Sequence, residues 1–111
     1  MSWLLRDGDV LAALEARRRG WQTGIAGAVI VTRPAMVHTW KGGARLDLAW
    51  CVRARTDDGN PCLEVKHITC LGPYRMARPR LSGAIVAAGA GAFERWHLQV
   101  GDRLEVRPAD E

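Results

Sequence analysis

Hydrophobic and polar residues alternate along the middle of the chain, and the alternation predicts a long β-hairpin. Between residues 46 and 55 every second position is apolar, which places on one strand face Leu46, Leu48, Trp50, Val52 and Ala54. The other face carries Asp47, Ala49, Cys51, Arg53 and Arg55. Residues 56–61, Thr-Asp-Asp-Gly-Asn-Pro, have the composition of a turn. We therefore expect residues 62–71 to return as the partner strand.

A second hairpin is predicted at the start of the chain. Residues 3–6 and 10–14 flank Asp7-Gly8-Asp9, and the glycine supplies the positive φ that a tight hairpin turn requires. Residues 15–20 then favour a short helix ended by Gly20. The alternative is one continuous helix over residues 10–19, because Leu11, Leu14 and Arg18 also fit a helical stripe.

The C-terminal part predicts two further strands around one helix. Residues 81–88 form an apolar run, and a small-residue turn follows it. Phe93 and Trp96 lie three residues apart, on one face of a short helix over residues 91–97. A Val100-Gly101-Asp102 turn precedes a closing strand, and residues 28–32 predict another strand earlier in the chain. The fold class we expect is α+β but mainly β, a curved antiparallel sheet or partly closed small barrel with two or three short helices.

Composition indicates one soluble domain over residues 1–111. Hydrophobic residues make up 48% and charged residues 25%, as in ordinary globular proteins. No run approaches the ~20 apolar residues of a membrane span, and Arg6 comes too early for a signal peptide. The three cysteines are interpreted as reduced thiols. We expect a cytoplasmic protein with no membrane partner, and we interpret its five tryptophans as anchors of one shared core.

The net charge of +4 raises the question of a nucleic-acid partner. Two arginine clusters lie beside aromatic residues, namely residues 17–19 with Trp21, and Arg75, Arg78 and Arg80 with Tyr74. Arginines beside an aromatic ring can hold phosphates and stack a base. Acidic residues interrupt any single-sign surface, so weak nucleic-acid binding is kept as a second alternative only.

Neither a metal site nor a cofactor motif is predicted. Cys62, His67 and Cys70 have suitable ligand types, but on an extended strand the two thiols lie ~26 Å apart and the imidazole points to the other face. The Gly89-Ala-Gly-Ala-Phe-Glu94 stretch departs from a dinucleotide fingerprint because Glu94 takes the place of its third glycine. We interpret the glycines of this region, from Gly83 onward, as turn and close-packing residues.

One catalytic grouping is worth considering as the first alternative. His38, Asp47 and Cys51 lie near one another in sequence, and a thiolate beside an imidazole is a nucleophile. Such groupings are common by chance, so no catalytic residue is assigned. For Asp47, holding the backbone N–H groups of a loop is the better interpretation than acting as an acid.

Three blocks of the chain, taken together, resemble a known family. They are Val37-His-Thr-Trp40 with Leu46-Asp-Leu-Ala-Trp50, then Cys70-Leu-Gly-Pro-Tyr-Arg75, and Gly91-Ala-Phe-Glu-Arg-Trp-His-Leu-Gln-Val-Gly-Asp102. The Arg18-Arg-Gly-Trp21 stretch is also similar to a motif near the family's start. The family is the bacterial and archaeal domain of unknown function family 192, and the similarity covers nearly the whole chain in order. The resemblance implies a small, mostly β fold with a few short helices, and no established activity.

The chain departs from that family's pattern around the first block. Gly42, Ala44 and Arg45 stand where the family usually has a methionine and a Phe-Pro pair. Ala87 stands where it usually has a glutamate. The resemblance therefore implies that a pocket lined by those residues is altered in this chain.

From these observations we expect a non-enzymatic module that binds a small ligand or another protein. The absence of a competent catalytic motif and the presence of polar groups beside aromatics favour this class. Its oligomeric state is left open. The candidate ligand-binding residues are His38, Trp40, Asp47, Tyr74 and Arg75.

Overall fold

The protein is built mainly from β-strands. A computed structural model describes residues 2–17, 28–31, 37–38, 45–72, 76–77 and 83–108. Its strands are β1 (Ser2–Arg6), β2 (Asp9–Arg17), β3 (Ala28–Val31), β4 (Val37–His38), β5 (Leu46–Arg55), β6 (Pro61–Leu71), β7 (Met76–Ala77), β8 (Ala84–Gly89) and β9 (Arg103–Pro108). The helix in the described part is α1 (Ala92–Arg95). The expected mainly β class is confirmed.

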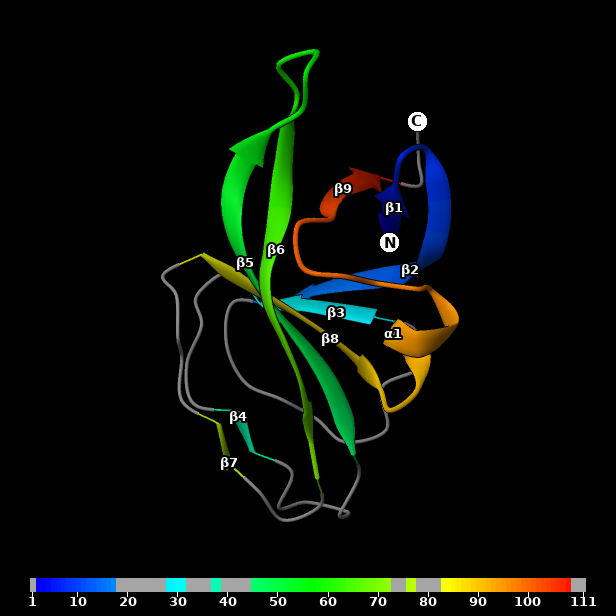
Figure 1. The fold of residues 1–111 in the computed structure, drawn as a ribbon. Coiled ribbons are helices and arrows are strands. Elements are labelled where there is room, and N and C mark those ends of the chain that lie inside the picture. Colours follow the sequence, from blue (N-terminus) through cyan, green and yellow to red (C-terminus); the bar gives the residue numbers. More distant parts are fainter. Residues whose placement is uncertain are drawn as a thin grey trace.

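Seven strands pair side by side in a ring, in the order β1-β2-β3-β8-β5-β6-β9, and pairing of β9 with β1 closes a small barrel (Figure 1). The seam between β6 and β9 is narrow, with Leu63 opposite Leu104 and Glu64 opposite Arg103. One neighbouring pair, β2 and β3, runs parallel. This pair differs from the antiparallel sheet that was expected, because parallel neighbours need a crossover that alternation along the two strands does not reveal.

The N-terminal hairpin is confirmed, and the helix expected after it is wrong in its first part. Arg6 pairs with Asp9 across a turn in which Asp7 (φ 53°) and Gly8 (φ 85°) both have positive φ, as a two-residue type I′ turn requires. Residues 15–17 belong to β2 and pair with β3 instead of starting a helix. Pairing with a neighbouring strand outweighs the helix propensity of this segment, since propensity is worth only tenths of a kcal/mol per residue. Residues 18–20 lie outside the described part, and within that part α1 is the one helix found.

Alternation along β5 separates two hydrophobic clusters. The inner cluster fills the barrel and includes Ala49 and Cys51 with residues from β1, β3, β8, β9 and α1. The outer cluster lies on the opposite face of β5 and comprises Leu46, Leu48, Trp50, Leu71, Ile85 and Ala87. The β5 strand is therefore buried on both faces from Leu46 to Cys51.

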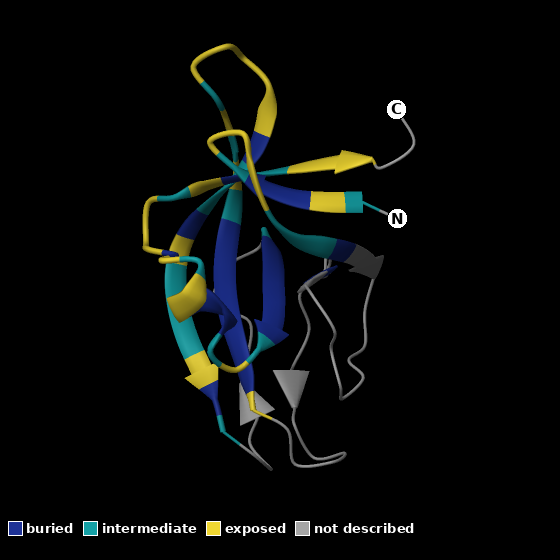
Figure 2. Ribbon diagram, turned by 90° about the vertical axis from the view of Figure 1, so that its right-hand side faces the viewer, coloured by how far each residue is buried: buried dark blue, intermediate teal, exposed yellow. Residues whose placement is uncertain are grey.

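The second half of β5 leaves the barrel with β6. Beyond Cys51 the strand has no β8 partner, and the β5–β6 hairpin projects past the ring as the green arm of Figure 1. Thr56 closes its turn, with hydrogen bonds to Asn60 and Gly59, as the turn sequence predicted. Figure 2 shows that the hairpin tip is exposed and that burial is concentrated in the middle of the sheet.

The tryptophans do not all serve one core. Trp50 is buried in the outer cluster and Trp96 packs against the inner one, but Trp3 is 37% exposed on the outside of β1. Trp21 and Trp40 lie outside the described residues. The expectation of a single shared set of indole anchors is therefore wrong for Trp3.

Candidate functional site

Asp47 is a buried residue that organises the backbone next to it. Its side-chain Oδ2 accepts hydrogen bonds from the backbone N–H of Gly91 at 3.0 Å and of Phe93 at 3.1 Å. Both donors lie at the start of α1, where N–H groups have no partner inside the helix. Asp47 therefore holds backbone N–H groups, as the sequence indicated, and its Oδ2 is occupied by this contact.

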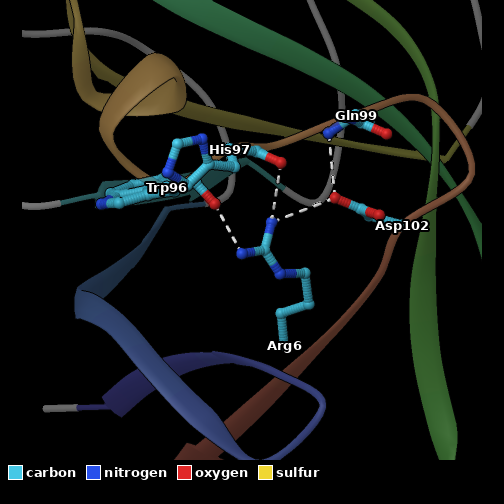
Figure 3. Close-up of polar contacts among 5 residues, drawn as sticks. All are labelled: Arg6, Trp96, His97, Gln99 and Asp102. Carbon is cyan, nitrogen blue, oxygen red and sulfur yellow. Dashed lines mark hydrogen bonds and ion pairs between the residues drawn. The ribbon is translucent and has the colours of Figure 1, made fainter.

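The other end of the same helix is held by Arg6 from β1. Its guanidinium donates to the backbone carbonyls of Trp96 and His97 and lies 3.1 Å from the carboxylate of Asp102 (Figure 3). That Asp102 oxygen also accepts from the backbone N–H of Gln99 at 2.9 Å. Sequence reasoning missed Arg6, because it lies ninety residues before its first carbonyl partner and no local pattern marks such a contact.

Cys70 lies directly across the sheet from Asp47. The two residues share a cavity of about 390 Å³ with Ile68, Thr69, Gly91, Phe93 and Glu94, which we call the helix-side cavity. Loss of part of its water shell raises the pKa of the Cys70 thiol, and a hydrogen bond to Asp47 and the charge of that carboxylate raise it further, against the opposing effect of Arg45. A thiol with a raised pKa is a poor nucleophile at neutral pH.

Cys51 also lacks the properties of a catalytic thiol. Its side chain is fully buried in the inner cluster, and burial raises its pKa to about 12. A nucleophilic cysteine needs the opposite shift, towards the thiolate. The chemistry of Cys51 therefore does not favour the alternative in which it acts as a nucleophile with His38.

Of the other four predicted ligand-binding residues, only His38 lies within the described part of the chain. His38 pairs with Met76 through the backbone of the small β4–β7 sheet. Trp40, Tyr74 and Arg75 lie outside the described residues, as do Gly42 and Ala44. The β4–β7 pairing nevertheless brings together the two chain segments that adjoin them in sequence. Asp47 is separate in role, since its Oδ2 is bound to the start of α1.

Two of the four residues that differ from the pattern of the resembled family lie in the described part of the structure. Arg45 is exposed at the start of β5. Ala87 is fully buried in the outer cluster and pairs with Leu48. A glutamate at that position would place a charge among apolar side chains, at a considerable cost in desolvation. An alanine is compatible with the apolar surroundings that this chain provides.

A second cavity was not foreseen from the sequence. It has a volume of about 430 Å³ and is lined by Ile30, Arg53, Ala54, Pro61, Cys62, Leu63, Leu104 and Val106. These residues come from β3, β5, β6 and β9, and β3 is not a ring neighbour of β6 or β9. Because the cavity is lined from opposite sides of the ring, we place it at the end of the barrel, beside the projecting β5–β6 hairpin. We call it the barrel-end cavity.

The barrel-end cavity is apolar apart from Arg53. Leu104 and Ile30 belong to the inner cluster and Leu63 packs against it, so the cavity continues the barrel core towards solvent. Arg53 has no hydrogen bond or ion pair among the described residues, whereas the nearby Arg55 donates to the Gly59 carbonyl at 2.9 Å. No acidic side chain lines this cavity in the described part of the chain.

In the described part of the chain, one buried side-chain polar atom has no hydrogen-bond partner. The indole Nε1 of Trp50 lies in the outer cluster without an acceptor, although Trp50 is only 1% exposed. Buried donors are nearly always paired, and an exception marks a place that can take a water molecule or another acceptor. Trp50 belongs to the outer cluster and does not line the barrel-end cavity.

Comparisons with protein-family profiles, curated proteins and solved structures match nothing to this chain. Within the residues that the structure describes, no three His, Cys, Asp or Glu side chains gather as a metal site would require. In the same part of the chain no helix is long and apolar enough to cross a membrane.

Proposed function

We propose that this protein is a non-enzymatic binding module that holds a small, mainly apolar molecule in the barrel-end cavity. The observation that carries the proposal is the cavity itself, about 430 Å³ lined chiefly by apolar side chains from four strands. This volume lies in the range of small-molecule sites, roughly 300–1,000 Å³. Some small β-barrels hold one small ligand in the interior, and the mouths of β-barrels are among the usual places for ligand sites.

The walls of the cavity differ in how well they are already buried. Ile30 and Leu104 are core residues with 6% and 0% exposure. Val106 is 42% exposed at the rim. A ligand in the cavity would remove Val106 and its neighbours from water, and burial of apolar area contributes about 25 cal/mol per Å². Burial of apolar area alone therefore gives a favourable contribution to the binding free energy of an apolar ligand, without any polar contact.

The surface expected around His38, Trp40, Tyr74 and Arg75 stays a second candidate for ligand or protein binding. The β4–β7 pairing supports it, because it draws together β4, which carries His38, and β7, which follows Tyr74 and Arg75 in sequence. Asp47 leaves that set, since its role at the start of α1 accounts for its burial and its hydrogen bonds.

A titration with decanol tests the proposal, because decanol is apolar and uncharged. We expect the amide NMR signals of Ile30, Leu63 and Leu104 to move together and to saturate. Val106→Trp should obstruct the cavity and weaken binding. Val100→Trp is the matched control, because Val100 is 61% exposed in a turn and does not line the cavity. Shifts confined to other residues, or equal binding by both variants, would contradict the proposal.

A further inference from the structure

We propose that the natural ligand of the barrel-end cavity is an amphiphile, with an apolar body and one carboxylate that pairs with Arg53. This inference rests on the proposed function, and it specifies the ligand class of the same site. It combines two properties of the cavity wall, the apolar lining and one cation, Arg53, that has no partner among the described residues. Each property selects one end of the ligand.

The charges around the cavity favour an anion. Arg53 lines the cavity without a hydrogen-bond or ion-pair partner among the described residues. Three acidic residues on β6, β9 and the hairpin turn already have basic partners. These pairs are Glu64 with Lys66 and Arg103, Asp57 with Arg103, and Glu105 with Arg107. Asp58 lies in the exposed hairpin turn and does not line the cavity. Among the described residues, a carboxylate entering the cavity therefore meets a guanidinium without a partner and no acidic side chain in the cavity wall. The guanidinium can hold it through two parallel hydrogen bonds.

The strand register fixes where the two ends of the ligand would lie. Arg53 on β5 pairs with Leu63 on β6, and Leu63 pairs with Leu104 on β9. The three residues form a row across three strands, with the cation on the projecting hairpin and the leucines towards the barrel core. A carboxylate at Arg53 thus leaves the hydrocarbon body over Leu63 and Leu104, with Ile30 on the far wall.

The shape of the site favours a free molecule over a membrane surface. The cavity is lined by strands from opposite sides of the ring, so it encloses part of its occupant. The large exposed apolar side chains of the described residues are Trp3, Val10, Val100 and Val106, and of these only Val106 lines the cavity. A bilayer would need several such side chains together on one surface.

The test compares decanoate with decanol, two molecules that share a hydrocarbon chain and differ in charge. Binding is measured by calorimetry and NMR at concentrations below micelle formation, at low salt. We expect decanoate to bind roughly fivefold more tightly than decanol, the effect of one partly exposed ion pair. Arg53→Gln should reduce decanoate affinity to the level of decanol and leave decanol affinity unchanged. Arg55→Gln is the matched control and should change neither, because Arg55 does not line the cavity.

The outcomes separate the two proposals. Equal affinity for both probes, unaffected by Arg53→Gln, would overturn the amphiphile inference and leave the binding module in place. Failure of both probes to bind would overturn both. Sedimentation with vesicles of phosphatidylglycerol provides the remaining arm. Arg53-dependent vesicle binding without decanoate binding would assign the cation to a membrane surface and overturn the inference. Thermal unfolding of Arg53→Gln confirms that the variant is folded.

Discussion

Asp47 and Arg6 hold opposite ends of the same short helix. Asp47 accepts from the N–H groups of Gly91 and Phe93 where α1 begins, and Arg6 donates to the carbonyls of Trp96 and His97 where it ends. The negative residue lies at the positive end of the helix and the positive residue at its negative end, which is the favourable arrangement. A helix of four residues is too short to be stable alone, so these long-range contacts and the burial of Phe93 maintain it.

Removal of the Asp47 carboxylate should destabilise the fold. Asp47→Ala leaves two N–H groups near the core without an acceptor, and we expect a loss of roughly 2–4 kcal/mol in the free energy of unfolding. Asp47→Asn keeps an acceptor oxygen and should lose less. Urea denaturation measures both values. Asp58→Ala, in the exposed β5–β6 turn, is the control and should change stability by less than about 0.5 kcal/mol. A loss no larger than this in Asp47→Ala would refute the role assigned to Asp47.

Arg6 should contribute to stability through geometry as well as charge. Arg6→Ala removes donors to two carbonyls and the ion pair with Asp102, at an expected cost of about 1–2 kcal/mol. Arg6→Lys keeps the charge but has no planar fork, so it should restore only part of the loss. A double-mutant cycle with Asp102→Ala measures how far the two residues depend on each other. Strict additivity would show that the Arg6–Asp102 pair carries no energy of its own.

Of the glycines compared in the described part of the chain, Gly83 is the one where a side chain is least compatible with the fold. A Cβ there would lie 1.9 Å from the carbonyl oxygen of Cys51, so the backbone of β5 or β8 would have to move. We expect Gly83→Ala to lose at least about 2 kcal/mol. Gly8→Ala is the comparison, since its Cβ would meet nothing within 4 Å and only the positive φ opposes it. That variant should lose about 1 kcal/mol. Thermal and urea unfolding rank the two, and the reverse order would contradict the close contact.

Cys51 should make stability depend on alkaline pH. Burial raises its pKa from 9.0 to about 12 in the folded protein. Between these values the unfolded chain loses the thiol proton while the folded chain keeps it. The contribution of Cys51 is therefore complete below pH 9 and declines as pH rises towards 12, by up to about 1.4 kcal/mol per pH unit. Cys51→Ala should be less stable at neutral pH, but its stability should fall less steeply from pH 9 to 11. Parallel pH profiles for the two proteins would exclude this linkage.

Local patterns were sufficient for the hairpins and for the final turn and strand. Alternation of apolar and polar residues predicted β5, and the turn that begins at Thr56 predicted the pairing of β5 with β6. Both signals depend only on neighbours in sequence. The assignment of residues 15–17 failed because their partner, β3, is reached through a crossover that no local pattern encodes. For the same reason alternation in β5 could identify two faces but not that both are buried.

The candidate site was harder to predict than the fold. Asp47 could be selected as a holder of N–H groups because it interrupts an apolar strand beside a later glycine-rich turn. Arg53 could not be selected, since in sequence it is one of many arginines. Its significance comes from the register that sets it beside Leu63 and from the absence of β8 opposite it. The first follows from the hairpin itself, but the second depends on how the ring is assembled.

The pairing of β9 with both β1 and β6 has a consequence for the order of assembly. The last strand pairs with the first, Ser2 opposite Pro108, and also with β6. Until it is synthesised, β1 and β6 each present an unpaired edge, and such edges can join those of another chain. Pairing between strands so far apart in sequence also forms slowly, because the entropy of closing a long loop opposes it. This topology therefore exposes a nascent chain to self-association until β9 is in place.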